Sequence, residues 1–265
     1  MTNLLISSSV TNNLKDSAAF AKELGLGIEV SRFPNFKNIH NDFDSILLQL
    51  ENDLKDFDGF KSLHGMFFDQ SIASNDPEIR EISQKRHRQS LEAAKIIDAK
   101  IVVFHSGHKG MKHKESQTKF KQNSILFWKE FIQEFEESKI TAVIENVLER
   151  DYNLILDIIS EVNSPYLKAS IDTGHANLFS KHSINEWIDA YDDKLHHMHI
   201  HNNFGDDDSH YSLLNGSIQF PEVFDKLRSI DTIPTIVFEI FKKNDLLESI
   251  DYFTKYMERT KCIKR

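Results

Sequence analysis

Residues 141–175 read TAVIENVLERDYNLILDIISEVNSPYLKASIDTGH, and this stretch indicates how the chain folds. The runs 141–147 and 167–175 are short and rich in apolar or β-branched residues, whereas the residues between them have helical spacing. A strand, a helix and a further strand in this order are typical of βα units on a parallel sheet. The stretch therefore predicts an α/β protein.

The same alternation extends in both directions from this stretch. Six further strand-like runs are NLLISSS (3–9), GIEVSRF (27–33), FKSLHG (60–65), IVVFHSG (101–107), LHHMHIHN (195–202) and TIVFEIF (235–241). Plausible helices lie between them, and one is expected to begin at Pro77 with Asn75 or Asp76 as its cap. An open doubly wound sheet usually has fewer strands and a Gly-rich first turn, which SSSVTNN (7–13) lacks. Eight strands alternating with helices therefore predict a (β/α)8 TIM barrel.

Composition limits the classes of protein to consider. The 265 residues contain no Pro/Gly-rich linker or short repeat, so a single domain spanning 1–265 is the simplest interpretation. The lone Cys262 excludes an intramolecular disulfide and a cysteine zinc site, which favours a reducing compartment and hence the cytoplasm. No apolar run approaches the ~20 residues of a membrane span. The net charge of -9 disfavours general nucleic-acid binding, and the oligomeric state stays open.

Metal-binding residue types stand at the ends of six successive predicted strands. They are His64, His105, Glu145, Asp172 with His175 shortly after it, His199 and Glu239. The strand ends of such a barrel meet at one mouth, so these side chains are expected to be neighbours and to form the active site there. Buried carboxylates without a partner cost several kcal/mol each, which a cation would offset. Carboxylates with imidazoles suit Zn(II), Mn(II) or a similar ion, so the pattern predicts a divalent-metal site.

The stretch HHMHIHNNFGDDDSH (196–210) adds more groups of this kind. Alternate residues of a strand share a face, and His199 is the one aligned with the neighbouring strand ends, so we expect it to be a ligand. The neighbours expected to donate hydrogen bonds or to lie at the rim are His196, His197 and His201. Asp208 and His210 could chelate one ion, but their spacing alone is equally typical of an Asp-rich loop.

Six short motifs occur in an order that resembles the xylose-isomerase-like TIM-barrel superfamily, which includes endonuclease IV and the sugar isomerases and epimerases. The motifs are FHSG (104–107), AVIEN (142–146), IDTGHA (171–176), MHIHN (198–202), DSHYSLLNGSI (208–218) and FEIF (238–241). For the epimerase branch the resemblance implies one metal held by Glu145, Asp172, His199 and Glu239. The two glutamates would then act as acid and base on a carbon next to a carbonyl.

For the endonuclease IV branch the resemblance implies three metals. The first would bind His64, His105 and bridging Glu145, the second Glu145, Asp172, His199 and Glu239, and the third His175, Asp208 and His210. All nine positions carry the matching residue type, so this resemblance favours phosphoester hydrolysis by a cluster of two or three ions. Zinc is the first expectation for the metal and manganese the second. The sugar or sugar phosphate isomerase and epimerase branch is the alternative.

The substrate is expected to be phosphorylated or sugar-like. Lys109, in the lysine-rich segment 108–121, could bind a phosphate or belong to a solvated face. Arg32 could contact a phosphate or face solvent, and Glu29 could reach the site or pair with Arg32, so Glu29 is left out of the ligand set. The segments SRFPNFKN (31–38) and HGMFFDQS (64–71) are short or different compared with the loops by which endonuclease IV clamps DNA. DNA is therefore possible as a partner, but the net charge does not support it.

Overall fold

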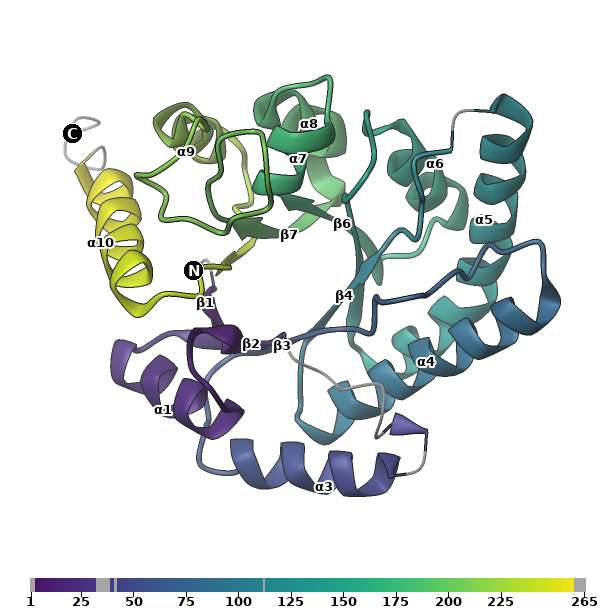
Figure 1. Cartoon of the computed structure of the whole chain (residues 1–265), viewed down its shortest axis with the longest axis horizontal. Helices are drawn as coiled ribbons and strands as arrows, with labels where there is room; N and C mark the ends of the chain where they lie inside the picture. Colours follow the sequence, from purple (N-terminus) through teal and green to yellow (C-terminus); the bar gives the residue numbers. More distant parts are fainter. Residues whose placement is uncertain (1–2, 32–38, 41, 112, 260–265) are drawn as a thin grey trace.

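The computed structural model describes residues 3–31, 39–40, 42–111 and 113–259. Eight parallel strands close into a barrel in sequence order, from β1 beside β2 round to β8 beside β1 (Figure 1). The strands are β1 (Leu4–Ser7), β2 (Gly27–Val30), β3 (Lys61–His64), β4 (Ile101–His105), β5 (Thr141–Glu145), β6 (Leu167–Asp172), β7 (Leu195–Ile200) and β8 (Thr235–Phe238). The predicted (β/α)8 barrel is confirmed, with each strand inside the run expected to form it.

Helices surround the barrel on its outside (Figure 1). They are α1 (Leu14–Leu24), α3 (Phe43–Leu54), α4 (Pro77–Ile96), α5 (Lys114–Ser138), α6 (Asn153–Val162), α7 (Thr173–Phe179), α8 (Ile184–Tyr191), α9 (Phe220–Ser229) and α10 (Lys243–Arg259), with short 3-10 turns η1 (Ser8–Val10) and η2 (Asp192–Lys194). The predicted start of α4 is confirmed, because the Asp76 side chain accepts the Glu78 N–H and Pro77 occupies the first turn. None of the helices in the described ranges is both long and apolar enough to cross a bilayer.

The main apolar core lies between the strands and the helices. Phe104 of β4 points outward and packs against Trp128 and Phe135 of α5, and all three are almost fully buried. His87 of α4 joins them, with its ring stacked 4.5 Å from that of Phe104. Burying these large aromatic side chains contributes to the hydrophobic stabilisation that holds the helices against the strands.

The interior of the barrel is much more polar. A small separate apolar cluster contains Ile101 and Val103 of β4 and Val143 of β5. Above it, Glu29 of β2 contacts His197 of β7, and these strands are not neighbours in the sheet, so the contact crosses the interior. Bulky branched residues usually fill this space. These polar interior residues contact the cluster at the mouth of the barrel, since Glu29 also contacts His199.

Candidate metal centre

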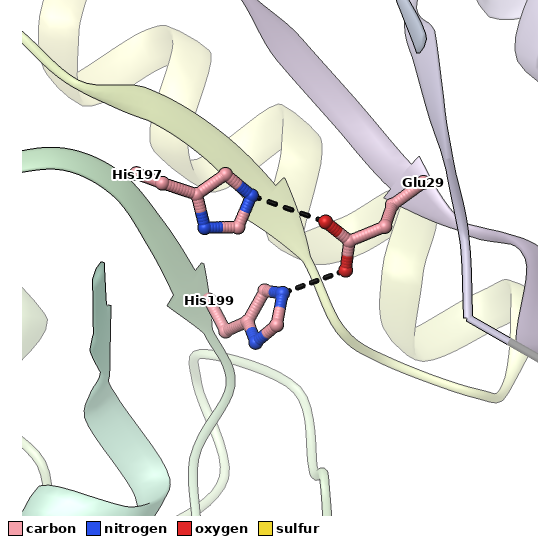
Figure 2. A group of neighbouring side chains, drawn as sticks. All are labelled: Glu29, His197 and His199. Carbon is pink, nitrogen blue, oxygen red and sulfur yellow. Dashed lines mark hydrogen bonds and ion pairs between the residues drawn. The ribbon is translucent and has the colours of Figure 1, made fainter. Parts of the chain in front are cut away.

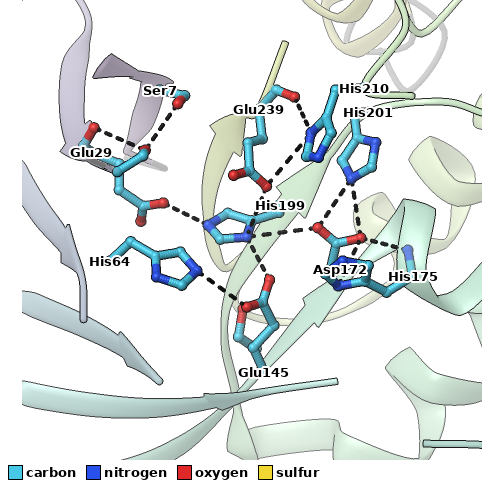
Figure 3. A network of polar contacts seen from close by, with 12 residues as sticks. Ser7, Glu29, His64, Glu145, Asp172, His175, His199, His201, His210 and Glu239 are labelled. Atoms are coloured by element: carbon cyan, nitrogen blue, oxygen red, sulfur yellow. Dashed lines mark hydrogen bonds and ion pairs between the residues drawn. The ribbon is translucent and has the colours of Figure 1, made fainter. Parts of the chain in front are cut away.

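Three carboxylate side chains surround one ring nitrogen of His199. His199 Nδ1 lies 2.6 Å from Glu145 Oε1, 3.3 Å from Glu239 Oε2 and 3.7 Å from Asp172 Oδ2 (Figure 3). The residues lie on β5, on β6, on β7 and directly after β8. His199 and Asp172 are fully buried and Glu145 nearly so. Three carboxylates around one imidazole nitrogen form a ligand set for a divalent cation.

A second group lies at the other oxygen of Glu145. Glu145 Oε2 is 3.1 Å from His105 Nε2 and 3.5 Å from His64 Nε2, yet it lacks a hydrogen bond of proper geometry. A buried carboxylate oxygen without a donor is costly. Two ring nitrogens face this oxygen, and together the three residues form a group whose ligand atoms lie within 4.8 Å of one another. A cation placed here would satisfy all three, so the residues fit a metal.

A third group gathers at Asp208, in the loop after β7. Asp208 Oδ2 is 3.3 Å from His175 Nε2 and 3.2 Å from His210 Nε2. This carboxylate is partly exposed, whereas the two imidazoles are mostly buried. All nine residues expected as ligands from the sequence therefore lie in one continuous cluster at the mouth of the barrel. Their positions suit the predicted roles, which stay proposals below.

Backbone carbonyls fix the orientation of three histidine rings in this cluster. The contacts are His64 Nδ1 to Gly65 O at 3.0 Å, His175 Nδ1 to Asn146 O at 3.0 Å, and His210 Nδ1 to Glu239 O at 2.8 Å. A carbonyl oxygen can only accept, so each Nδ1 carries a proton and donates it. In the neutral ring the lone pair then lies on Nε2, which faces a carboxylate. This is the tautomer and orientation that metal-binding histidines need.

The charges of the cluster shift the pKa values of its members. Burial would raise the pKa of Glu145 and Asp172, but neighbouring imidazoles outweigh it: His199 holds the pKa of Glu145 well below its usual range, and His175 and His201 lower that of Asp172 to about 2. For four of the imidazoles, burial would likewise lower the pKa, but the facing carboxylates outweigh it. The raised values belong to His64, His175, His199 and His210, the last at about 9. Metal-free, the cluster is therefore a set of buried ion pairs.

The motif IDTGHA shows how local structure serves the site. Asp172 ends β6 and caps α7, because its Oδ1 accepts the His175 N–H at 2.7 Å. Its other oxygen is left to face His199 and His201, the latter at 3.1 Å. A Cβ at Gly174 would lie 2.0 Å from Cε1 of His201, so only glycine allows this close approach.

Glu29 is the important residue that the sequence interpretation left out. It is fully buried on β2, and its Oε1 lies 2.6 Å from His199 Nε2 (Figure 2). Its Oε2 lies 3.1 Å from His197 Nε2 and accepts a hydrogen bond from Ser62 Oγ at 2.9 Å. The signal in the sequence was a glutamate inside the apolar strand GIEV. Pairing with Arg32 was the alternative, and Arg32 lies outside the described residues.

Of the other histidines in and directly after β7, His197 and His201 contact carboxylates, but both lie deeper than the rim. His197 and His201 are fully buried, and His196 is partly buried. His201 contacts Asp172 and stacks on His210 with ring centres 3.9 Å apart. Lys109 is exposed in the loop between β4 and α5. The proposed binding of substrate by Lys109 and Arg32 stays a prediction.

Three solved structures are similar to this chain over nearly their whole length. A D-tagatose 3-epimerase-like protein has a TM-score of 0.80 and 22% identity, covering 100% of both chains. A Thermus thermophilus protein soaked with ZnCl2 has a TM-score of 0.78 and 22% identity, covering 96% of this chain and 97% of the other. D-psicose 3-epimerase with D-tagatose from Clostridium cellulolyticum H10 has a TM-score of 0.77 and 16% identity, covering 97% and 100%.

At these identities the likeness establishes the fold, and sugar epimerases are among its neighbours. The family model described as xylose isomerase-like TIM barrel matches residues 18–256, which is most of the chain. This confirms the resemblance that the six motifs suggested. The chain therefore belongs to the xylose isomerase-like TIM-barrel family.

Proposed function

We propose that this protein is a divalent-metal-dependent epimerase or isomerase of a sugar or sugar-like substrate. The observation that carries the proposal is the convergence of Glu145, Asp172 and Glu239 on His199 Nδ1. The sugar 3-epimerases among the similar structures support the same choice. They favour the epimerase alternative over the phosphoester hydrolase that the residue pattern ranked first.

The two glutamates are the proposed acid and base. Glu145 comes from β5 and Glu239 follows β8, so they reach the centre from different sides of the mouth (Figure 3). One carboxylate takes the proton from a carbon next to the substrate carbonyl, and the electrons of that C–H bond move into an enediolate. The other glutamate, protonated, returns a proton to the opposite face, which inverts the carbon. The starting ketose and its epimer differ only in that configuration.

A cation bound by this set would polarise the carbonyl and hydroxyl oxygens of the substrate. The carboxylates and imidazole are ligands that both zinc and manganese accept, so the donor set leaves the choice between them to metal availability. Asp172, through its cap on α7 and its contact with His201, is held in place without taking part in proton transfer.

A second candidate is phosphoester hydrolysis by two or three ions. The observation in its favour is that His64 and His105 gather at Glu145, and His175 and His210 at Asp208, although a one-metal epimerase does not require them. Several ions around one phosphate can activate a water and neutralise the leaving oxygen. In this case a phosphorylated substrate, with DNA included, would replace the sugar.

The deciding experiment compares proton exchange with phosphoester cleavage. Protein loaded with Zn(II) or Mn(II) is incubated in D2O with a panel of ketoses, and loss of the carbon-bound proton signal is followed by NMR. We expect exchange in the wild type and a loss of about 10²- to 10⁴-fold in Glu145→Gln and Glu239→Gln, the range for removing a general acid or base. Glu149→Gln is the matched control, since Glu149 is a buried glutamate that accepts hydrogen bonds from Ser106 Oγ and the Val147 N–H.

The same preparations are tested for nicking of a duplex with an abasic site. Cleavage without ketose exchange would overturn the epimerase proposal in favour of the hydrolase. His210→Ala gives a further distinction, because it removes a ligand of the Asp208 group and leaves the four-residue centre complete. Epimerisation should survive this change, whereas hydrolysis that needs a third ion should not. Bound ions per chain, measured by elemental analysis, should agree: one favours the epimerase, and two or three favour the hydrolase.

A further inference from the structure

Four of the histidines in the cluster present one ring nitrogen to a carboxylate and have the other nitrogen held by a second partner, in two different ways. In His64, His175 and His210 the second nitrogen, Nδ1, donates to a neutral backbone carbonyl. In His199 the arrangement is reversed. Its Nδ1 faces the ligand carboxylates, and its Nε2 contacts the fully buried carboxylate of Glu29 at 2.6 Å.

We propose that Glu29 is a positioning residue, which fixes the tautomer and orientation of His199 so that its Nδ1 lone pair faces the metal. With the proton on Nε2 and donated to Glu29 Oε1, Nδ1 is free to bind a cation. A carboxylate behind a ligating imidazole also makes the ring a stronger base and therefore a stronger ligand. The inference rests on the metal-binding part of the proposed function and not on the reaction.

The surroundings of Glu29 hold its carboxylate in place. Oε2 of Glu29 contacts His197 Nε2 (Figure 2). It also accepts a hydrogen bond from Ser62 Oγ, and the other nitrogen of His197 contacts Ser170 Oγ at 2.9 Å. The five residues come from β2, β3, β6 and β7, so the network crosses the barrel interior. Each contact limits the rotation of the next side chain, and the chain of contacts ends at His199.

The trio Glu29, His197 and His199 is also close enough to hold an ion of its own, but the contacts argue against that use. Direct distances of 2.6 and 3.1 Å are those of hydrogen bonds, and the remaining polar atoms of Glu29 and His197 are matched by the serines. In contrast, Glu145 Oε2 has no hydrogen-bond partner, although the ring nitrogens of His64 and His105 face it. The carboxylate below His199 therefore supports the ligand and does not replace it.

A purely structural role is the competing explanation, and the test separates the two. Zn(II) affinity is measured by competition with a chelator for the wild type, Glu29→Gln, Ser62→Ala and Glu149→Gln. We expect Glu29→Gln to weaken binding about 10- to 100-fold, the usual effect of losing a carboxylate behind a ligating histidine. Ser62→Ala removes one contact that holds Glu29 but keeps the Glu29–His199 contact, so its loss of affinity should be smaller than that of Glu29→Gln. Glu149→Gln removes a buried carboxylate elsewhere, so it should bind zinc as the wild type does.

The second measurement needs no variant. In zinc-loaded wild-type protein with ¹⁵N-labelled histidine, the His199 ring should carry its proton on Nε2, in a hydrogen bond to a carboxylate. A proton on Nδ1, or unchanged zinc affinity in folded Glu29→Gln, overturns the inference while leaving the proposed function intact. If the wild type binds no zinc or manganese, both fail. If Glu29→Gln weakens metal binding but no ketose exchanges protons, the inference stands and the proposed reaction is wrong.

Discussion

Adding zinc to the metal-free protein should release protons, and their number reports which sites fill. Glu29, Glu239 and Glu145 raise the pKa of His199 well above its usual value, against the effect of burial. Near pH 7 this ring is therefore an imidazolium when no metal is present. Nδ1 must lose its proton before it can bind a cation. Occupation of the four-residue centre alone should release about one proton per chain.

Filling the other two groups changes this number in a defined way. His175 and His210 also have raised pKa values, that of His210 being about 9, so an ion at Asp208 should release up to about two more protons. An ion at the remaining group should release up to about one, from His64, whose pKa is raised, whereas burial lowers the pKa of His105. Release of about one proton therefore indicates one metal, and about four indicates a full three-metal cluster.

Titration calorimetry in two buffers with different ionisation enthalpies measures this number directly. The sign of the pH dependence follows from the raised pKa values. In the metal-free fold the imidazolium pairs contribute stability that is fully present below pH 6.5, the usual histidine pKa, and is lost as the pH rises through the folded values, about 9 for His210. Zinc affinity should rise over the same window, by about tenfold per pH unit for each proton released. Zinc binding with no proton release at pH 7 would refute the reasoning.

Three further predictions concern stability. Burial lowers the pKa of His87 to about 4. The free energy of unfolding should therefore be unaffected by His87 above pH 6.5 and fall by about 3 kcal/mol as the pH drops to 4. Urea unfolding measures this loss, and His87→Leu should lack that part of the acid dependence. Gly174→Ala should cost at least about 1–3 kcal/mol from overpacking against His201, and wild-type stability in that variant would refute the packing argument. Trp128→Ala should cost about 3–5 kcal/mol, since this side chain is 1% exposed; a much smaller loss of Tm would contradict its place in the core.

The strands and the ligand cluster could be predicted because residues adjacent in the sequence identify each strand and the ligand near its end. Six successive strands, β3 to β8, carry a His, Asp or Glu at or beside their last residue. Because parallel strands in a barrel share one mouth, these six positions form one site. The start of α4 could be predicted in the same way, because the capping residue Asp76 directly precedes Pro77 in the first turn. A short stretch of sequence is therefore sufficient to predict each of these features.

Glu29 could not be assigned because its partners are distant. His197 and His199 are 168 and 170 positions away, and only closure of the barrel brings β7 opposite β2. Period two places the alternate histidines of β7 on one face, but it does not give their depth, so His197 and His201 were expected nearer the rim than they lie. Lys109 stands in a loop, where no periodic pattern predicts the direction of a side chain.

The strand β7 carries His197 and His199 within it and His201 directly after it, and successive residues of a strand point to opposite faces. A single codon inserted ahead of His197, or deleted there, would turn all three rings toward the helices and bring Met198 and Ile200 to the interior. The gene can therefore tolerate exchanges of one side chain along this strand far more easily than a change in its length. Insertions and deletions among functional descendants should be confined to the loops on either side of β7.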